Sequence, residues 1–140
     1  MPIRIASSSD VTRLHEIRTS VRENRLSRPD RISHQDYIAL LEGHGRGWVF
    51  EQDDTIVAFG IADARSRSIW ALFVEPRFEG RGIGRALLDE MTAWLFAQSD
   101  ESVWLTTAPG TRAAHFYRAA GWREAGEING EIRFETSRGR

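Results

Sequence analysis

The residues best suited to chemistry in this sequence lie between Phe73 and Leu88, where the chain reads FVEPRFEGRGIGRALL. Three glycines at alternate positions, Gly80, Gly82 and Gly84, follow an apolar run. An amphipathic stretch begins directly after them, so the pattern predicts a strand, a glycine-rich turn and the start of a helix. Uncovered backbone N–H groups at the positive end of a helix dipole bind phosphate. We therefore expect this segment to hold a pyrophosphate.

The neighbouring charges and the missing residue types narrow the choice of phosphate ligand. Arg77, Arg81 and Arg85 add cationic groups to the turn. Neither frame of the glycines matches the dinucleotide fingerprint, which needs glycine at the first, third and sixth positions. A nucleoside triphosphate loop ends in Gly-Lys-Ser/Thr, and this chain contains no lysine. The lack of lysine also excludes a Schiff base with pyridoxal phosphate. The remaining alternative is a tight turn without a ligand.

Length and composition set the broad class of the protein. A chain of 140 residues predicts a single domain over residues 1–140. The net charge of −1 gives no reason to expect nucleic acid as a partner. The absence of cysteine excludes disulfides, thiol nucleophiles and cysteine-bound zinc, and no HExxH motif is present, so we expect no metal. No stretch is apolar enough for a membrane span or a signal peptide, which predicts a cytoplasmic protein.

Periodicity and turn signals predict the elements that position the glycine turn. Ser8 or Ser9 is expected to cap the first helix, and Ser33 with Asp36 to begin the second. Gly60 is expected to mark a bulge in its strand. The expected strands are 2–6, 48–51, 55–63, 69–74, 102–107, 122–128 and 131–135, and the expected helices are 8–21, 33–42, 83–95 and 111–120. This order predicts a mixed α/β (α+β) fold of about seven strands and four helices.

Two motifs in register connect the chain to a known family. The first is Glu79-Gly80-Arg81-Gly82-Ile83-Gly84, which is similar to the signature Gln/Arg-x-x-Gly-x-Gly/Ala. The second is TRAAHFYRAAGW, which supplies a polar residue, an alanine, Phe-Tyr, a glycine and an aromatic residue: Thr111, Ala114, Phe116, Tyr117, Gly121 and Trp122. With both motifs and the element order, the chain resembles the Gcn5-related N-acetyltransferase family. This family transfers acyl groups from acyl-coenzyme A to amines.

The resemblance implies where the coenzyme binds. It implies a central sheet with a splayed cleft between the central strand and strand 102–107. The pantetheine arm would pair with backbone groups of Leu72 to Val74, and the pyrophosphate would take N–H groups from Arg81 to Arg85. The full expected set for acetyl-CoA is Leu72, Phe73, Val74, Glu79, Gly80, Arg81, Gly82, Ile83, Gly84, Arg85, Thr111, Phe116 and Tyr117.

Two positions depart from the family pattern. Glu79 stands where glutamine or arginine is usual, and Thr111 stands where asparagine is common. A carboxylate beside the phosphates is expected to weaken coenzyme binding, and the neighbouring arginines to offset that effect.

The resemblance also implies catalytic roles. Tyr117 would donate to the coenzyme sulfur, since a phenol and a thiol have neighbouring pKa values. The N–H of Phe73 or Val74 would polarise the thioester carbonyl. Glu23 is the first candidate for the base that deprotonates the amine, and His34 is the second. The alternatives without a catalytic role are that Phe116 and Tyr117 only pack the helix against the sheet and that Glu23 is a solvated surface carboxylate.

Together these observations predict an acetyl-CoA-dependent N-acetyltransferase that acts on a primary amine of a small molecule by direct attack in a ternary complex. A peptide or protein amine and a non-catalytic acyl-CoA-binding module remain alternatives, as does a pure interaction domain. Arg22, Arg25, Arg28 and Arg31 recur every third residue, and they would favour an amine that also carries a carboxylate or phosphate. A homodimer is common in the family.

Overall fold

A computed structural model describes residues 2–21 and 32–138. Within these residues, seven strands form one sheet in the order β1-β2-β3-β4-β5-β7-β6. The strands are β1 (Ile3–Ile5), β2 (Gly45–Gln52), β3 (Thr55–Asp63), β4 (Ser68–Val74), β5 (Val103–Thr107), β6 (Arg123–Ile128) and β7 (Glu131–Thr136). The α-helices are α1 (Val11–Ser20), α3 (His34–Leu41), α4 (Ile83–Phe96) and α5 (Arg112–Ala119), and the 3₁₀ turns are η1 (Ser8–Asp10) and η3 (Pro76–Phe78). The predicted mixed fold of seven strands and four helices is confirmed.

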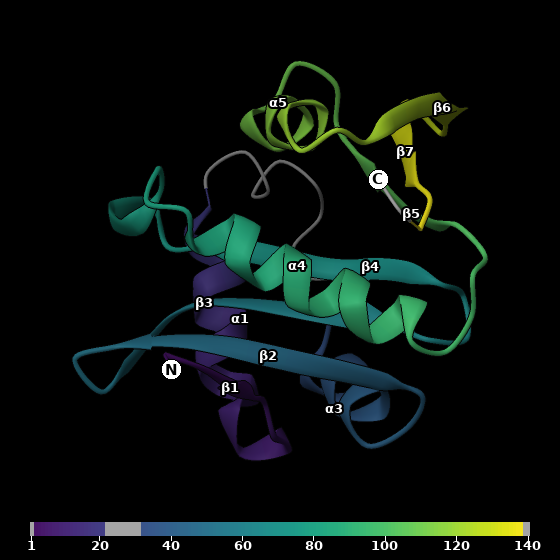
Figure 1. Ribbon diagram of the computed structural model, residues 1–140. Helices are drawn as coiled ribbons and strands as arrows, with labels where there is room; N and C mark the ends of the chain where they lie inside the picture. Colours follow the sequence, from purple (N-terminus) through teal and green to yellow (C-terminus); the bar gives the residue numbers. More distant parts are fainter. Residues whose placement is uncertain (1, 22–31, 139–140) are drawn as a thin grey trace.

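The helices form two layers on opposite faces of the sheet (Figure 1). One apolar core joins α4 and α5 to the sheet, and it includes Leu87, Met91 and Phe134. A second core joins α1 and α3 to the other face, and it includes Leu14 and Tyr37. None of the helices in residues 2–21 and 32–138 has the length and hydrophobicity needed to cross a membrane.

Local sequence signals place most element boundaries. Ser33 and Asp36 form the predicted capping box, in which the Ser33 N–H donates to the Asp36 carboxylate at 2.8 Å. The predicted hairpin at Asn129-Gly130 has positive φ at both residues, 52° and 83°. The first helix differs from the prediction. Ser8 begins a 3₁₀ turn rather than capping the helix, and α1 starts at Val11.

A bulge lies between β3 and β4, but the extra residue is on β4. Ile61 pairs with Ala71 and Ala62 pairs with Ile69, so Trp70 has no partner across the ladder. The prediction of a bulge at Gly60 is therefore wrong. Gly60 instead leaves room for the end of the Met91 side chain, because a Cβ at Gly60 would lie 2.6 Å from the Met91 Cε.

The central strands β4 and β5 separate after a single point of contact. They run parallel and pair only at Ser68 and Trp104, where the Trp104 N–H donates to the Arg67 carbonyl at 3.1 Å. The rest of β5 is paired instead with β7, from Val103 to Thr107. Figure 1 shows β5 running at an angle to β4. This is the splayed arrangement that the sequence resemblance implied.

Candidate active site

The glycine turn presents an open backbone surface at the start of α4. Gly80 and Gly82 have φ of +77° and +83°, a conformation that favours glycine. Both are exposed, and a Cβ at either position would meet no heavy atom within 4 Å. Gly82 is the N-cap of α4 and places no side-chain acceptor over the first turn. The unpaired N–H groups of the first turn form the positive end of the helix dipole, so the residues present fit a diphosphate.

Gly84 lies where three segments meet, and it has room for a Cβ. A Cβ at Gly84 would lie 3.6 Å from the Phe116 ring and 3.6 Å from the Val74 Cγ2. The end of β4, the start of α4 and the middle of α5 therefore touch at this glycine. The structure thus brings together the three stretches expected to bind acetyl-CoA: 72–74, 79–85 and 116–117.

The three arginines of the turn are not equivalent. Arg77 pairs with Glu75 at 2.8 Å, and Arg85 pairs with Asp89 at 3.1 Å. Arg81 donates at 3.5 Å to the Arg77 carbonyl and lies over the Phe78 ring at 5.1 Å from its centroid. Among the described residues, Arg81 is the one of the three with no carboxylate partner. It is therefore the arginine whose charge is most available to a phosphate.

Both departures from the family motif have a local partner in α5. The Glu79 Oε1 lies 3.4 Å from the Arg112 Nε, so a cation from α5 faces the carboxylate of the turn. Thr111 is the N-cap of α5, where its Oγ1 accepts from the Ala114 N–H at 3.2 Å and donates to the Ala108 carbonyl at 2.8 Å. The described contacts of Thr111 therefore hold the helix start in place.

Tyr117 lies in the core between α5 and the sheet. Its side chain is 6% exposed and packs on Trp122 and Phe134, with ring centroids 5.5 Å and 5.9 Å away. Within the described residues no hydrogen bond reaches the phenol oxygen. This oxygen is nevertheless not completely enclosed by protein atoms. Burial raises the pKa of Tyr117 well above its ordinary value. The pKa of Tyr117 therefore lies far above that of a thiol, which is about 8.5, whereas the two were expected to be close.

Glu75, directly after β4, is held by two arginines. Arg13 of α1 reaches its carboxylate at 2.6 Å and also donates to the Ile56 carbonyl at 2.9 Å, while Arg77 binds the other carboxylate oxygen. Partial burial raises the pKa of Glu75, but the hydrogen bonds from Arg77 and Arg13 outweigh that effect and hold the pKa below its usual range. Glu75 is therefore a structural anion at the entry to the turn and a poor base.

The opposite face of β4 carries a set of residues that sequence reasoning did not assemble. The His15 Nδ1 lies 3.0 Å from the Tyr37 Oη, and the His34 ring stands edge-on to His15 at 5.6 Å. Tyr37 is fully buried and meets the Trp70 ring edge-on at 5.3 Å. We call His15, His34, Tyr37 and Trp70 the acceptor-side cluster. No spacing rule could have found it, because its members come from α1, α3 and the bulge of β4.

The first candidate base and the arginine run cannot be placed. Glu23 and the residues Arg22, Arg25, Arg28 and Arg31 lie outside the described residues. His34, the second candidate, is exposed at the start of α3 and belongs to the acceptor-side cluster.

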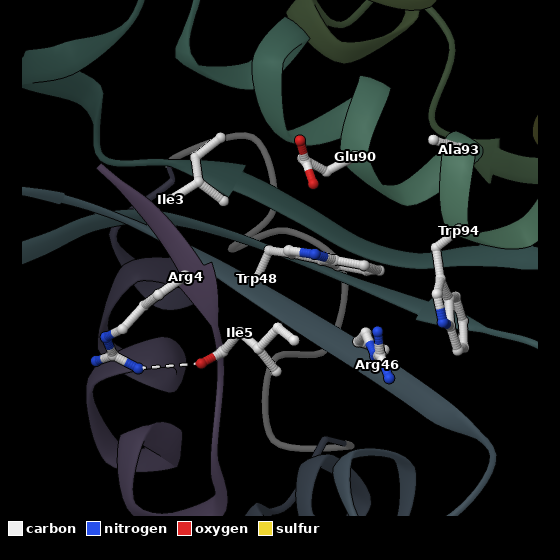
Figure 2. A pocket seen from close by; sticks show the side chains of 8 residues that line it. All are labelled: Ile3, Arg4, Ile5, Arg46, Trp48, Glu90, Ala93 and Trp94. Carbon is white, nitrogen blue, oxygen red and sulfur yellow. Dashed lines mark hydrogen bonds between the residues drawn. The ribbon is translucent and has the colours of Figure 1, made fainter. Parts of the chain in front are cut away.

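A surface pocket of about 410 Å³ lies away from the glycine turn, between β1, β2 and α4 (Figure 2). Trp48 and Trp94 meet edge-on in it at 5.8 Å, and the Arg46 guanidinium lies over the Trp94 ring at 5.3 Å. Glu90 faces the pocket from α4. None of the predicted site residues lines this pocket.

Comparison with known proteins agrees with this geometry. The acetyltransferase (GNAT) family matches residues 11–122 of the chain. The chain therefore belongs to this family, as its two motifs indicated. Members use acetyl-CoA as co-substrate, so the protein is an acetyl-CoA-dependent acyltransferase of the N-acetyltransferase type. A search among curated proteins finds no significant match.

Solved structures share the fold across nearly the whole chain. The PaiA N-acetyltransferase from Thermoplasma acidophilum, solved with coenzyme A, has a TM-score of 0.81 and 14% identity over 98% of this chain and 99% of its own. A GCN5-related N-acetyltransferase from Rhodopseudomonas palustris has a TM-score of 0.80 and 18% identity, with 96% and 94% covered. The ribosomal-protein-S18-alanine N-acetyltransferase from Escherichia coli has a TM-score of 0.76 and 19% identity, with 96% and 93% covered.

Proposed function

We propose that this protein transfers an acetyl group from acetyl-CoA to a primary amine of a small molecule, by direct attack within a ternary complex. The observation that carries this proposal is the single pairing of β4 with β5 at Ser68. Beyond that point the β5-facing backbone of Leu72, Phe73 and Val74 has no strand partner among the described residues. An extended pantetheine chain pairs with such an edge in the manner of an added strand.

The proposed roles follow the open surfaces of the site. The N–H groups from Arg81 to Arg85 hold the diphosphate, with the Arg81 side chain as its first cationic contact. The N–H of Phe73 or Val74 polarises the thioester carbonyl, so that negative charge develops against a fixed donor. The chain has no cysteine, which favours direct attack by the amine over a thioester-linked acyl-enzyme.

Tyr117 is proposed to donate a hydrogen bond to the departing sulfur. Its phenol has no partner within the described residues, so the donor is available without breaking an existing contact. Because burial raises its pKa, complete proton transfer to the thiolate is disfavoured and Tyr117 stabilises the thiolate as a hydrogen-bond donor. Phe116 completes the wall beside Gly84.

A thiol-release assay with acetyl-CoA and a panel of amines tests the proposal. The panel contains benzylamine, spermidine, glycine and a peptide beginning with alanine. Thiol release that depends on the small amines supports the proposal. Release with the peptide alone would instead make a peptide N-terminus the acceptor, an alternative suggested by the ribosomal-protein alanine N-acetyltransferase among the structural neighbours. Calorimetric binding of acetyl-CoA without any turnover would refute the transfer reaction.

Four further expectations stand as proposals beside this one. They are a single domain over residues 1–140, a cytoplasmic location, a homodimer, and Glu23 as a candidate for the base, with His15 as its rival. The arginine run from Arg22 to Arg31 adds the proposal that the preferred amine also carries a carboxylate or phosphate. If Glu23 is the base, Glu23→Gln lowers turnover and leaves acetyl-CoA binding unchanged, whereas unchanged turnover would remove Glu23 and leave His15 as the candidate.

A further inference from the structure

Outside the proposed coenzyme site, the His15 side chain forms a polar contact with the Tyr37 hydroxyl. Their polar atoms are 3.0 Å apart, and Tyr37 is fully buried between α3 and the sheet. His15 is only partly buried, so its ring joins a fixed buried partner to an accessible surface. A histidine oriented through one nitrogen by a neighbour, with the other nitrogen available, is a common arrangement for proton transfer.

The contact between His15 and Tyr37 lies next to the part of β4 that separates from β5. Tyr37 meets Trp70 at 5.3 Å, and Trp70 is the extra residue of the β4 bulge. Trp70 also lies two residues beyond Ser68, where β4 leaves β5. Trp70 and Phe73 pack toward α1 and α3, whereas Leu72 packs toward α4. The acceptor-side cluster therefore backs β4 on the face opposite to the glycine turn and α4.

Burial and the neighbouring charges favour the neutral form of His15. His34 and Tyr37 face it from α3, Arg18 acts on it from its own helix, and the uncharged Trp70 of β4 lies behind Tyr37. Burial, followed by the electrostatic interactions with His34 and Arg18, lowers the pKa of His15. Burial raises the pKa of Tyr37, against the opposing effect of Arg18, so the partner of His15 is a neutral phenol. A neutral imidazole at pH 7 can accept a proton.

We propose that His15 takes the proton of the acceptor ammonium, that Tyr37 is a positioning residue for its ring, and that the exposed His34 lies on the exit path to solvent. This inference rests on the proposed function. This step needs the tautomer with hydrogen on Nδ1, in which His15 donates to the Tyr37 oxygen and its Nε2 carries the lone pair. An N–H bond of the ammonium breaks, an N–H bond forms at Nε2, and the electron pair stays on the amine nitrogen for attack. The imidazolium then releases its proton to water beside His34.

A pair of acceptors separates base catalysis from a structural role. Benzylamine is protonated at pH 7 and must lose a proton, whereas aniline is already neutral. We expect His15→Gln to lower kcat/KM for benzylamine about 100-fold and to change the value for aniline less than about threefold. Tyr37→Phe should shift the acidic limb of the benzylamine pH profile with an unchanged acetyl-CoA affinity. His115→Gln, an exposed histidine on α5, is the matched control and should behave as wild type.

An equal loss with both amines, or no loss with benzylamine, would overturn the assignment. A second measurement does not depend on turnover. The chain has four histidines, so NMR titration can follow each of them. We expect His15 to titrate below the ordinary value and to move in Tyr37→Phe but not in His115→Gln. A His15 titration that ignores Tyr37 would also overturn the proposal. If wild type acetylates neither amine, the proposed small-amine function fails, and the titration still decides whether His15 is held as described.

Discussion

Replacing Glu79 with glutamine should strengthen acetyl-CoA binding. Glu79 places a carboxylate in the turn proposed to hold the diphosphate, and Arg112 faces it at 3.4 Å. The substitution keeps the size of the side chain and removes its charge. It therefore removes the repulsion between the carboxylate and the phosphates, and it releases the Arg112 guanidinium from that carboxylate. Both effects favour a bound anion.

The solvent exposure of Glu79 and Arg112 sets the expected gain in acetyl-CoA affinity. The Glu79 side chain is 28% exposed and the Arg112 side chain is 65% exposed, so water screens both. Exposed ion pairs contribute about 0.2–1 kcal/mol, which corresponds to about 1.4- to 5-fold in the dissociation constant. The free energy of unfolding should fall by no more than about 1 kcal/mol, because the lost pair lies at the surface.

Calorimetric titration with acetyl-CoA at low and high salt measures the change. The gain in affinity should shrink as salt is added, since the Debye length falls from about 30 Å at 0.01 M to about 8 Å at 0.15 M. Glu90→Gln is the matched control, because it removes the same charge from α4 in the surface pocket of Figure 2. Weaker binding by Glu79→Gln, or an equal gain with Glu90→Gln, would refute a local repulsion at the turn.

Three other substitutions test separate parts of the site. Tyr117→Phe should lower kcat at least about tenfold and leave acetyl-CoA affinity unchanged, as measured by thiol release and calorimetry, because one hydrogen bond to a charged group contributes about 1.5–3 kcal/mol. Gly82→Ala should lower the free energy of unfolding by about 1–2 kcal/mol in urea titrations, because φ is +83° there. Gly84→Ala, at ordinary φ, should cost less and is the control. Glu75→Gln should flatten the loss of stability below pH 5, because the folded-state pKa of Glu75 lies below its unfolded value and its contribution disappears as pH falls.

The sequence predicted those parts of the structure that short-range chemistry determines. Asn129-Gly130 and the Ser33–Asp36 capping box act within a few residues, and both are found as predicted. The glycine turn was predictable for the same reason, because left-handed backbone at Gly80 and Gly82 is a local requirement.

The parts that could not be predicted depend on contacts between distant segments. The Arg112 cation that faces Glu79 comes from another helix, so the sequence offered only the arginines of the turn as partners for this carboxylate. Gly60 suggested a bulge because glycine in a strand is ambiguous from sequence, and only the structure shows Met91 filling the space. His15 lacked any motif, because its partner Tyr37 approaches from α3.

The two apolar cores lie on opposite faces of β4, and this explains why β4 is the strand on which both substrates are proposed to meet. Without its bulge, strict alternation would place Trp70 on the same face as Leu72. The extra residue instead sends Trp70 toward Tyr37 while Leu72 still packs against the α4 side. The early separation from β5 then leaves the same stretch of backbone unpaired. One irregular strand therefore offers a coenzyme-side face, an acceptor-side face and free backbone donors within a few residues.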